Sequence, residues 1–437
     1  MHKYTILGLA RSGIAAAYKL KELGYSPFLS EYQPADKIAK ANQISQDFAC
    51  EFGGHTVAAL DCATMIVSPG IPDIPILQAA KDQGIELISE IELGFRLKAT
   101  DSKIIAVTGS NGKSTTVSLI NYILQTAGYQ TILAGNIGAA FTSFPIQNQG
   151  IDFIVLELSS FQLELIKDFR ADAAILLNIT PDHLDRYASF TEYAATKFKI
   201  FQKQKSDDLA IINLDDPEIA KLTSQIRARK ATFGRHPQAD IRADASKIIS
   251  SNANYKIADL SLQGPHNIAN CQAAILLAEH LQIPAETIRT ALKKFSALPH
   301  RLEFVATING IDFVNDSKAT NTDSVKFALQ SFSQPLRLIM GGRGKGEDYS
   351  ILNPFLEKYV SKLYLIGEAA AEMAETYTQS CPLQKFNSLE AAVLAAFQEA
   401  KKGETVLLSP ACTSYDMYKN FEARGNSFKQ IVRKLQA

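Results

Sequence analysis

The chain has 437 residues, which at roughly 150 residues per domain suggests about three domains. Apolar residues make up 46% and charged residues 21%, close to the globular average and unlike the composition of disordered chains. The 45 basic residues balance the 45 acidic ones, so the chain lacks the net positive charge typical of proteins that bind nucleic acid or anionic membranes. Only a local basic patch remains possible.

The five cysteines are scattered, and no two of them form a CxxC pair. This pattern argues against a disulfide framework or a structural zinc site and fits a reducing cytosol. The amino-terminal run MHKYTILGLARSG has no signal-peptide cleavage pattern, and the longest apolar runs are far shorter than the ~20 residues of a membrane span. We therefore expect a soluble, cytoplasmic protein with neither membrane nor nucleic-acid partners.

The chain alternates short apolar runs with helical patterns, a rhythm typical of parallel, doubly wound sheets. A first unit has expected strands at residues 4–7, 26–30 and 65–67, a Gly-rich turn at 8–13 and a helix at 14–23. A second begins near Lys103, with strands at 104–107, 132–134, 153–158, 173–177 and 209–212 and a helix at 113–127. The polar segment 234–261 predicts short strands and loops at a domain edge. A third unit follows the turn at 299–301, with strands at 313–315, 337–340, 362–366 and 405–408.

The strongest motif is IIAVTGSNGKSTT at residues 104–116, where a strand, a Gly-rich loop and a helix start follow in order. Backbone N–H groups of such a loop, together with the positive end of the helix dipole, face a polyphosphate. Lys113 would reach the β- and γ-phosphates, and Ser114 would ligate Mg²⁺. The spacing departs from the common P-loop, because Val107 stands where GxxxxGK[ST] has its first Gly. An ordinary strand-to-helix turn is the alternative, and the complete order of features favours ATP.

The turn from Gly8 to Gly13 resembles the dinucleotide-binding fingerprint, with Ala10 in place of the middle glycine. Glu31 follows the next strand, where an acidic residue would meet a ribose hydroxyl. Two interpretations stay open here. One is a nucleotide or nucleotide-sugar half-site, and the other is a closely packed turn that binds nothing.

Polar groups also follow strands of the second unit. Glu157 in LELSSFQLE stands where a carboxylate suits Mg²⁺, and its flanking leucines argue against exposure. His183 in NITPDHLDRY has Asp182 and Asp185 beside it, so a metal or substrate role and a structural role are about equally supported. The pattern around Lys197 is more simply explained by a solvated basic helix face.

Three polar segments follow strands of the third unit, namely NDSKATN at 315–321, GGRGKG at 341–346 and SPACTSYDMYKNFEARG at 409–425. Polar loops at the carboxyl ends of parallel strands form ligand sites. Lys345 would bind an anion there, and Ser414 and Phe421 would frame a small substrate.

These motifs resemble those of the Mur ligases of bacterial cell-wall synthesis over essentially the whole chain. GSNGKST is shared with folylpolyglutamate synthetases and indicates only the superfamily. The segments LELSSFQLE, DHLDRY, NDSKATN and SPACTSYDMYKNFEARG are most similar to those of the members that add D-glutamate to UDP-N-acetylmuramoyl-L-alanine. Two rivals stay open: another ligase of the superfamily, such as the L-alanine-adding enzyme, and a non-catalytic nucleotide-binding protein.

The resemblance implies an α/β fold with three domains and a monomeric enzyme. A Rossmann-like UDP-binding domain would span residues 1–92, a central P-loop ATPase-type domain with a parallel sheet 93–297, and a Rossmann-like amino-acid-binding domain 298–437. A hinge is expected near residues 297–300. The resemblance also implies ATP, two Mg²⁺ ions and an acyl-phosphate intermediate.

The resemblance further implies a role for individual residues. The UDP substrate would contact Ser12, Glu31, Tyr32, Gly70 and Asn136, although Glu31-Tyr32 stands where many relatives have Asp-Thr. ATP would contact Gly109, Ser110, Asn111, Gly112, Lys113, Ser114, Thr115, Asn267, Asn270, Arg301, Asp316 and Lys318. D-Glutamate would contact Thr320, Lys345, Ser414 and Phe421. Magnesium would be held by Ser114, Glu157, His183 and a carbamylated Lys197. The carbamylated lysine replaces the interpretation of Lys197 as part of a solvated basic helix face. The catalytic residues would be Lys113, His183 and Lys197. Arg343, where relatives have an acidic residue, receives no role.

Overall fold

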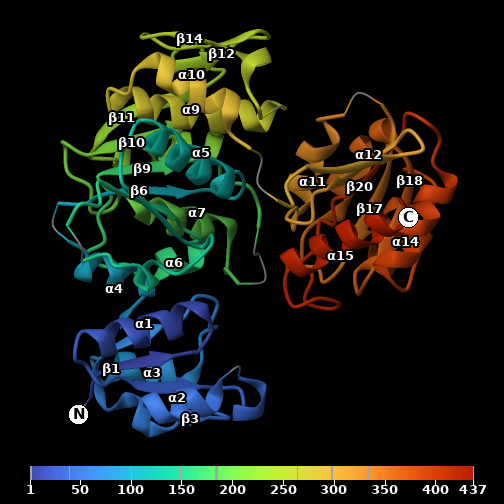
Figure 1. The fold of residues 1–437 in the computed structure, drawn as a ribbon. Helices are drawn as coiled ribbons and strands as arrows, with labels where there is room; N and C mark the ends of the chain where they lie inside the picture. Colours follow the sequence, from blue (N-terminus) through green and yellow to red (C-terminus); the bar gives the residue numbers. More distant parts are fainter. Residues whose placement is uncertain are drawn as a thin grey trace. The chain divides into compact units, whose positions relative to one another are not determined.

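The computed structural model describes residues 2–38, 40–99, 101–147, 149–182, 186–262, 264–296, 299–332 and 334–436. The chain divides into two compact units (Figure 1). The first unit comprises Met1–Ile179, Thr191–Ala258 and Ala269–Leu292, and the second Thr180–Phe190, Asp259–Ile268 and Lys293–Ala437. The three sheets confirm the α/β class, and the expected domain boundaries stay predictions. No helix of the described residues is long and apolar enough to cross a membrane.

The amino-terminal sheet of the first unit is wholly parallel, with the strand order β3-β2-β1-β4-β5 typical of a Rossmann-like half. Helix α1 begins at Arg11, inside the expected turn. Its Gly13 packs so closely on the end of β1 that an added Cβ would lie 2.0 Å from the Gly8 carbonyl oxygen. The elements are β1 His2–Leu7, α1 Arg11–Glu22, β2 Phe28–Glu31, α2 Ala41–Asp47, β3 Ala49–Phe52, β4 Cys62–Val67, α3 Pro75–Asp82 and β5 Glu86–Ile88.

The central sheet of the first unit has nine strands in the order β14-β13-β12-β11-β10-β9-β6-β8-β7. The expectation of a parallel sheet is wrong at one edge, where β13 pairs antiparallel with β12 and β14. These three-residue strands are joined by loops too short for a parallel crossover. They confirm the short strands expected within residues 234–261. The strands are β6 Lys103–Thr108, β7 Thr131–Gly135, β8 Phe153–Glu157, β9 Ala173–Leu176, β10 Leu209–Asn213, β11 Arg229–Gly234, β12 Ile241–Ala243, β13 Lys247–Ile249 and β14 Asn254–Lys256.

Helices accompany the central strands, and they include the helix expected directly after the Gly-rich loop. They are α4 Glu90–Leu97, α5 Lys113–Thr126, α6 Ser160–Glu164, α7 Phe190–Phe198, α8 Pro217–Leu222, α9 Pro265–His280 and α10 Ala285–Lys294.

The carboxyl-terminal sheet has the order β15-β16-β20-β17-β18-β19 and is parallel except for β15. Strands β15 and β16 form a hairpin whose turn residues Asn309 and Gly310 both have positive φ, as a tight two-residue turn requires. The elements are β15 Glu303–Ile308, β16 Ile311–Asn315, α11 Thr322–Leu329, β17 Leu336–Gly341, α12 Asn353–Tyr359, β18 Val360–Ile366, α13 Ala370–Tyr377, β19 Leu383–Lys385, α14 Leu389–Glu399, β20 Thr405–Leu408 and α15 Phe421–Lys434.

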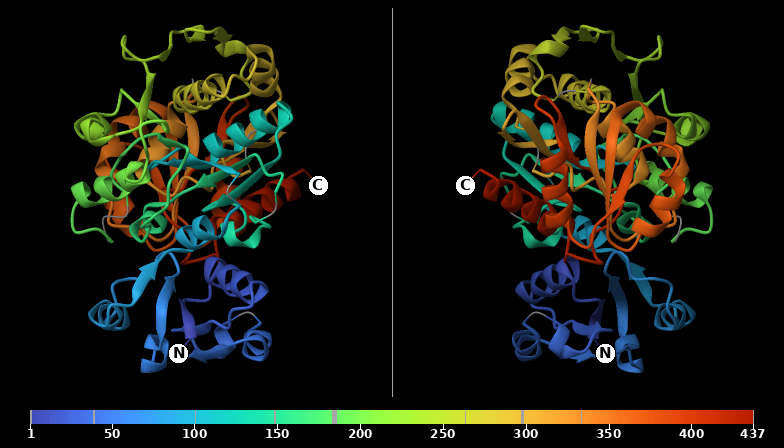
Figure 2. Two further views of the ribbon diagram at one scale, coloured as in Figure 1. Left: turned by 90° about the vertical axis from the view of Figure 1, so that its left-hand side faces the viewer. Right: turned by 90° about the vertical axis from the view of Figure 1, so that its right-hand side faces the viewer.

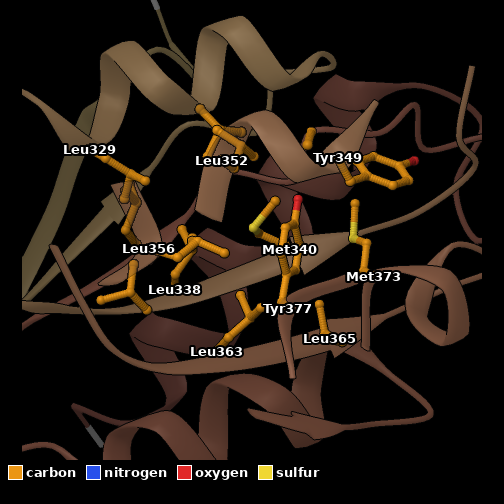
Figure 3. Packing of buried hydrophobic residues seen from close by; sticks show 14 of the residues in the cluster. Leu329, Leu338, Met340, Tyr349, Leu352, Leu356, Leu363, Leu365, Met373 and Tyr377 are labelled. Carbon is orange, nitrogen blue, oxygen red and sulfur yellow. The ribbon is translucent and has the colours of Figure 1, made fainter. Parts of the chain in front are cut away.

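Successive side chains of β17 and β18 enter opposite faces of this sheet, which buries both faces. Leu338 and Met340 pack on one side with α12 and α13 (Figure 3), whereas Ile339 and Tyr364 pack on the other with α14 and α15. Helices therefore cover both faces of the sheet, which is drawn in orange and red in the right-hand view of Figure 2. Because helices cover both faces, ligands of such a sheet bind at the polar loops beyond the carboxyl ends of the strands.

Glu92 of α4 joins two segments of the first unit through a fully buried carboxylate. Its oxygens accept hydrogen bonds from the backbone N–H groups of Lys167 at 2.8 Å, Asp168 at 3.0 Å and Phe169 at 2.9 Å. Arg96 donates to the same carboxylate at 2.9 Å. One buried carboxylate thus accepts three successive backbone N–H groups of the turn at residues 167–169.

Replacing Glu92 by glutamine should lower the free energy of unfolding by about 2–4 kcal/mol, because one acceptor oxygen becomes an NH₂ that faces N–H donors and the negative charge beside Arg96 is lost. Urea denaturation measures the change. The control is Glu286→Gln, since Glu286 is an exposed partner of Arg289 and its loss should cost less than about 0.5 kcal/mol. Equal stability of the two variants would contradict this role of Glu92.

Candidate functional site

The loop between β6 and α5 is built around two glycines that adopt backbone conformations unfavourable for other residues. Gly109 has φ of +153° and Gly112 of +85°, and an added Cβ on Gly112 would lie 2.4 Å from Asn270 Oδ1. Asn178, at the end of β9, holds the loop: its side-chain oxygen accepts the Asn111 N–H at 2.8 Å and its carbonyl oxygen accepts the Ser110 N–H at 3.0 Å. The result is a rigid backbone cradle at a helix start, which fits a polyphosphate.

Lys113 folds back over this cradle. Its Nζ donates to the carbonyl oxygens of Gly109 and Ser110, both at 2.7 Å. Ser114 and Thr115 follow in the first turn of α5, and both are buried. The expected ATP residues from Gly109 to Thr115 thus form one loop and the first turn of α5, and the ammonium group of Lys113 lies over this loop.

Lys197 lies in α7 and is only 2% exposed, so the interpretation as a solvated basic face is wrong. Its Nζ donates to the Gly109 carbonyl oxygen at 3.0 Å and lies 4.6 Å from the centre of the Tyr193 ring. The Tyr193 hydroxyl is in turn 3.0 Å from Ser110 Oγ. A signal existed in the sequence, because Tyr193 and Lys197 are four residues apart and share one face of α7, on which both are buried.

Glu157, the last residue of β8, is 1% exposed, which confirms the expectation that it is not a surface residue. Asn136 donates to its Oε1 at 2.6 Å, and the Asn136 N–H bonds the Glu157 carbonyl oxygen at 2.9 Å. Gly135 allows this contact, since a Cβ there would lie 2.3 Å from that carbonyl oxygen. The expected metal ligand and the expected muramoyl contact are therefore direct neighbours.

Arg11 connects this turn to the Gly-rich loop of the amino-terminal sheet, a link the sequence did not reveal. Its guanidinium donates to the carbonyl oxygens of Gly138 at 2.5 Å and Asn136 at 3.3 Å. Ser12, an expected UDP contact, is the next residue. The expected UDP and muramoyl contacts thus lie in segments that touch.

Glu31 is buried, and its carboxylate serves the local backbone. Its two oxygens accept the N–H groups of Leu9 at 2.6 Å and Gln33 at 2.9 Å, which fixes the start of the Gly-rich loop. Tyr32 beside it is 73% exposed, and Gly70 lies in the turn after β4 with φ of +88°. The amino-terminal sheet therefore presents an ordered loop and an exposed aromatic ring at the ends of its strands.

In the second unit, Asp316 follows β16 and is buried. It accepts the Ser409 hydroxyl at 2.8 Å and the Leu302 N–H at 3.2 Å, and burial raises the pKa of its carboxyl to about 7. Lys318 Nζ lies 5.2 Å from the centre of the Phe421 ring. The loops after β16 and β20 thus meet, as expected from their positions at strand ends. Asn267 and Arg301 belong to this same unit.

Lys345, expected to bind D-glutamate, lies in a buried charged cluster. Its Nζ is 2.5 Å from Asp182 Oδ1 and 3.7 Å from Glu347 Oε1. Glu347 also accepts the Thr322 N–H at 2.6 Å, and burial raises its pKa to about 7. Ser414 is buried in the loop after β20. The predictions for His183 and for its neighbour Asp185 fall outside the described residues.

Arg424 was missed by the sequence reasoning, although it lies within the quoted segment 409–425. It is fully buried, and burial lowers the pKa of its guanidinium to about 10. It donates to Ser317 Oγ at 3.0 Å and to the carbonyl oxygens of Cys412 at 3.0 Å, Thr413 at 3.2 Å and Gly341 at 3.4 Å. One side chain therefore ties together the loops that follow β16, β17 and β20.

Two models of Mur ligase domains match this chain. The model of the Mur ligase middle domain matches residues 107–278, and that of the Mur ligase glutamate ligase domain matches 300–412. Among solved structures, MurF from Acinetobacter baumannii (TM-score 0.64, 17% identity) covers 99% of this chain and 90% of its own. MurC from Thermotoga maritima (TM-score 0.63, 18% identity) covers 100% and 99%. These similarities show the fold.

Closer relatives define the branch. The UDP-N-acetylmuramoylalanine--D-glutamate ligase of Bacteroides fragilis is 41% identical over the full length of both chains. That of Koribacter versatilis is 39% identical over 98% of this chain and 97% of its own. The chain therefore belongs to the Mur ligases, and within them to the family of UDP-N-acetylmuramoylalanine--D-glutamate ligases, which confirms the resemblance found in the sequence.

Proposed function

We propose that the chain is a cytoplasmic enzyme that joins D-glutamate to UDP-N-acetylmuramoyl-L-alanine at the expense of ATP, in the synthesis of peptidoglycan precursors. The observation that carries the proposal is the full-length match to relatives of that name, at 41% identity for the Bacteroides fragilis protein. The rigid phosphate cradle with Lys113 at its opening supports the ATP-dependent part.

The chemistry follows from the poor reactivity of a carboxylate. Transfer of the ATP γ-phosphoryl group to an oxygen of the L-alanyl carboxylate forms an acyl phosphate and ADP. The amine of D-glutamate attacks the acyl carbon, a proton leaves the nitrogen, and the tetrahedral intermediate expels phosphate to give the amide. Lys113 holds a positive charge next to the transferred group, where negative charge accumulates.

Magnesium fits the donors around the cradle. Glu157 offers a buried carboxylate and Ser114 a hydroxyl, both hard oxygen ligands of the kind that Mg²⁺ prefers. His183 and a carbamylated Lys197 complete the proposed set. When bound, the ions would neutralise the phosphate charges and polarise the phosphoryl oxygens.

The surroundings of Lys197 support its carbamylation. Lys197 and Lys113 both donate to the Gly109 carbonyl oxygen, so two ammonium groups would lie close together beside a proposed cation site. The Lys197 ammonium first loses one proton to water. Bonding of the neutral nitrogen to the carbon of CO₂, with loss of a second proton to water, then replaces the positive charge by an anionic carbamate. Its oxygens are again ligands that suit Mg²⁺.

One assay tests the activity: phosphate release from ATP with UDP-N-acetylmuramoyl-L-alanine and a panel of amino acids. We expect turnover with D-glutamate and little with L-glutamate, L-alanine or glycine. A preference for another amino acid would point to a different ligase of the superfamily, and absence of any turnover would favour a non-catalytic nucleotide-binding protein.

Replacing Lys197 by alanine should leave almost no activity, with partial rescue by short carboxylic acids that fill the vacated space and restore an anion. The control is Lys203→Ala one turn beyond α7, where the side chain is 47% exposed and should not matter. Steady-state rates with and without added acetate or propionate measure the effect. Full activity of the Lys197 variant would rule out the carbamate.

A further inference from the structure

His55 is the last member of a series of hydrogen-bonded side chains, Glu51, Ser30 and His55, on the amino-terminal sheet. The proposed chemistry does not use these side chains. Ser30 Oγ lies 2.6 Å from Glu51 Oε1 and 2.7 Å from His55 Nδ1. Glu51 also accepts the Thr56 hydroxyl at 2.6 Å. Gly53 and Gly54 precede His55 with φ of +86° and +148°, and this sharp turn brings the ring back to Ser30.

This series determines which nitrogen of His55 carries the proton. Burial raises the pKa of Glu51, but its hydrogen bonds from Ser30 and Thr56 outweigh burial and hold the pKa below its usual value, so Glu51 is an anion that only accepts. Ser30 has one hydroxyl hydrogen, which it donates to Glu51. His55 Nδ1 must then donate its own hydrogen to Ser30 Oγ, and in the neutral ring Nε2 is left as a hydrogen-bond acceptor.

The ring lies at the nucleotide-binding edge of its sheet. The Gly54 N–H bonds the Glu31 carbonyl oxygen at 3.3 Å, and the Glu31 carboxylate holds Leu9 of the Gly-rich loop. The exposed Tyr32 ring is centred 6.2 Å from the His55 ring. In sheets of this order, nucleotides bind beyond the carboxyl ends of the strands, beside the first loop. A flat aromatic surface and a fixed acceptor therefore lie together where a base would be bound.

We propose that His55 selects the uracil base of the UDP substrate by accepting its N3–H at Nε2, while Tyr32 packs against the base. This assignment rests on the proposed UDP-linked substrate. Uracil carries a hydrogen on N3, whereas cytosine presents a lone pair there. A hydrogen-bond acceptor that Ser30 and Glu51 hold in place attracts uracil and repels cytosine. The series of side chains would therefore select UDP over CDP.

The test is calorimetric binding of UDP and CDP to the full-length protein, without ATP or amino acid. His55→Phe keeps a flat ring of similar size and removes both nitrogens. We expect it to weaken UDP binding about tenfold, the value of one good hydrogen bond, and to leave CDP binding within about twofold. Ser30→Ala, which releases the proton from Nδ1, should weaken UDP binding about threefold. His236→Phe, at an exposed site elsewhere in the first unit, should change neither.

A pH series gives a readout that a merely structural role would not produce. Burial lowers the pKa of His55 against the opposing charges of Glu51 and Glu31, so the ring is neutral near pH 7. As the pH falls through that pKa, Nε2 gains a hydrogen and turns from acceptor to donor. Binding of UDP-N-acetylmuramoyl-L-alanine should then weaken in the natural protein and stay unchanged with pH in His55→Phe, while Glu51, whose pKa is held below its usual value, remains ionised.

The outcomes separate the two proposals. If the natural protein binds UDP and His55→Phe keeps the same preference for UDP over CDP, the role of His55 is overturned and the ligase function stands. If the natural protein binds neither UDP nor the UDP-linked substrate, the proposed function fails, and the base-reading role fails with it. A cooperative urea denaturation curve of His55→Phe with the same midpoint as that of the natural protein shows that the variant is folded.

Discussion

Replacing Lys113 by alanine should abolish ligation, with a loss of at least about 10³-fold in kcat/KM. The Lys113 ammonium is held over the cradle by two carbonyl oxygens, and it is the group best placed to neutralise charge on the transferred phosphoryl group. Alanine keeps the glycines and the Asn178 contacts that shape the loop and removes only the two hydrogen bonds of the Lys113 ammonium to its carbonyl oxygens. Phosphate release measured with saturating ATP reports the loss.

A matched control lies on the strand that leads into the loop. Lys103 is the first residue of β6, at the opposite end from the cradle, and its side chain is exposed. Lys103→Ala should keep nearly normal turnover. If Lys113→Ala did so as well, the assignment of the phosphate loop would be wrong.

The second large effect is expected at Arg424 in the carboxyl-terminal unit. Methionine has a similar length but leaves the oxygens of Ser317 and Cys412 without the guanidinium donor in a buried place. The Thr413 carbonyl oxygen loses one of its two donors and keeps the Arg343 N–H. We expect a loss of about 3–5 kcal/mol in the unfolding free energy and a rise of at least about tenfold in KM for D-glutamate. Both follow from one cause, since the same contacts hold the loops that carry the expected D-glutamate residues.

Urea denaturation and steady-state kinetics measure the two effects of Arg424→Met. Arg343→Met is the control, because Arg343 pairs with Glu368 at the surface with its side chain 52% exposed. An Arg424 variant with unchanged stability and an unchanged KM for D-glutamate would show that the loops hold their shape without the guanidinium.

Much of the framework could be predicted from the sequence, because buried parallel strands are apolar runs and the loops after them are polar. The strand before Glu157 and the order of strand, glycines and helix at residues 104–126 were both predicted. The six-residue strands β11 and β15 were missed. Also among the strands that were not predicted are the edge strands β5 and β19, where three residues give too little pattern to recognise. Their pairing depends on neighbours that are distant in the sequence.

The site could be predicted less well than the fold, for a related reason. A lysine or arginine in a helical pattern is usually solvated, and the burial of Lys197 and Arg424 comes from carbonyl oxygens that other segments supply. Lys345 and Asp182 are 163 residues apart, so their pairing at 2.5 Å leaves no local signal. Only the resemblance to a family identified Lys197 as a functional residue.

The antiparallel end of the central sheet also bears on how the protein behaves at high concentration. An open strand edge exposes backbone donors and acceptors that can pair with another molecule and seed aggregation. Here that edge is β14, which has three residues, and its exposed positions are Asn254 and Lys256, while Tyr255 turns inward and donates to Glu279. A strand this short, with a charged lysine at its exposed edge, offers another molecule few backbone groups for pairing. It therefore protects the nine-stranded sheet against fibril-like growth at this edge.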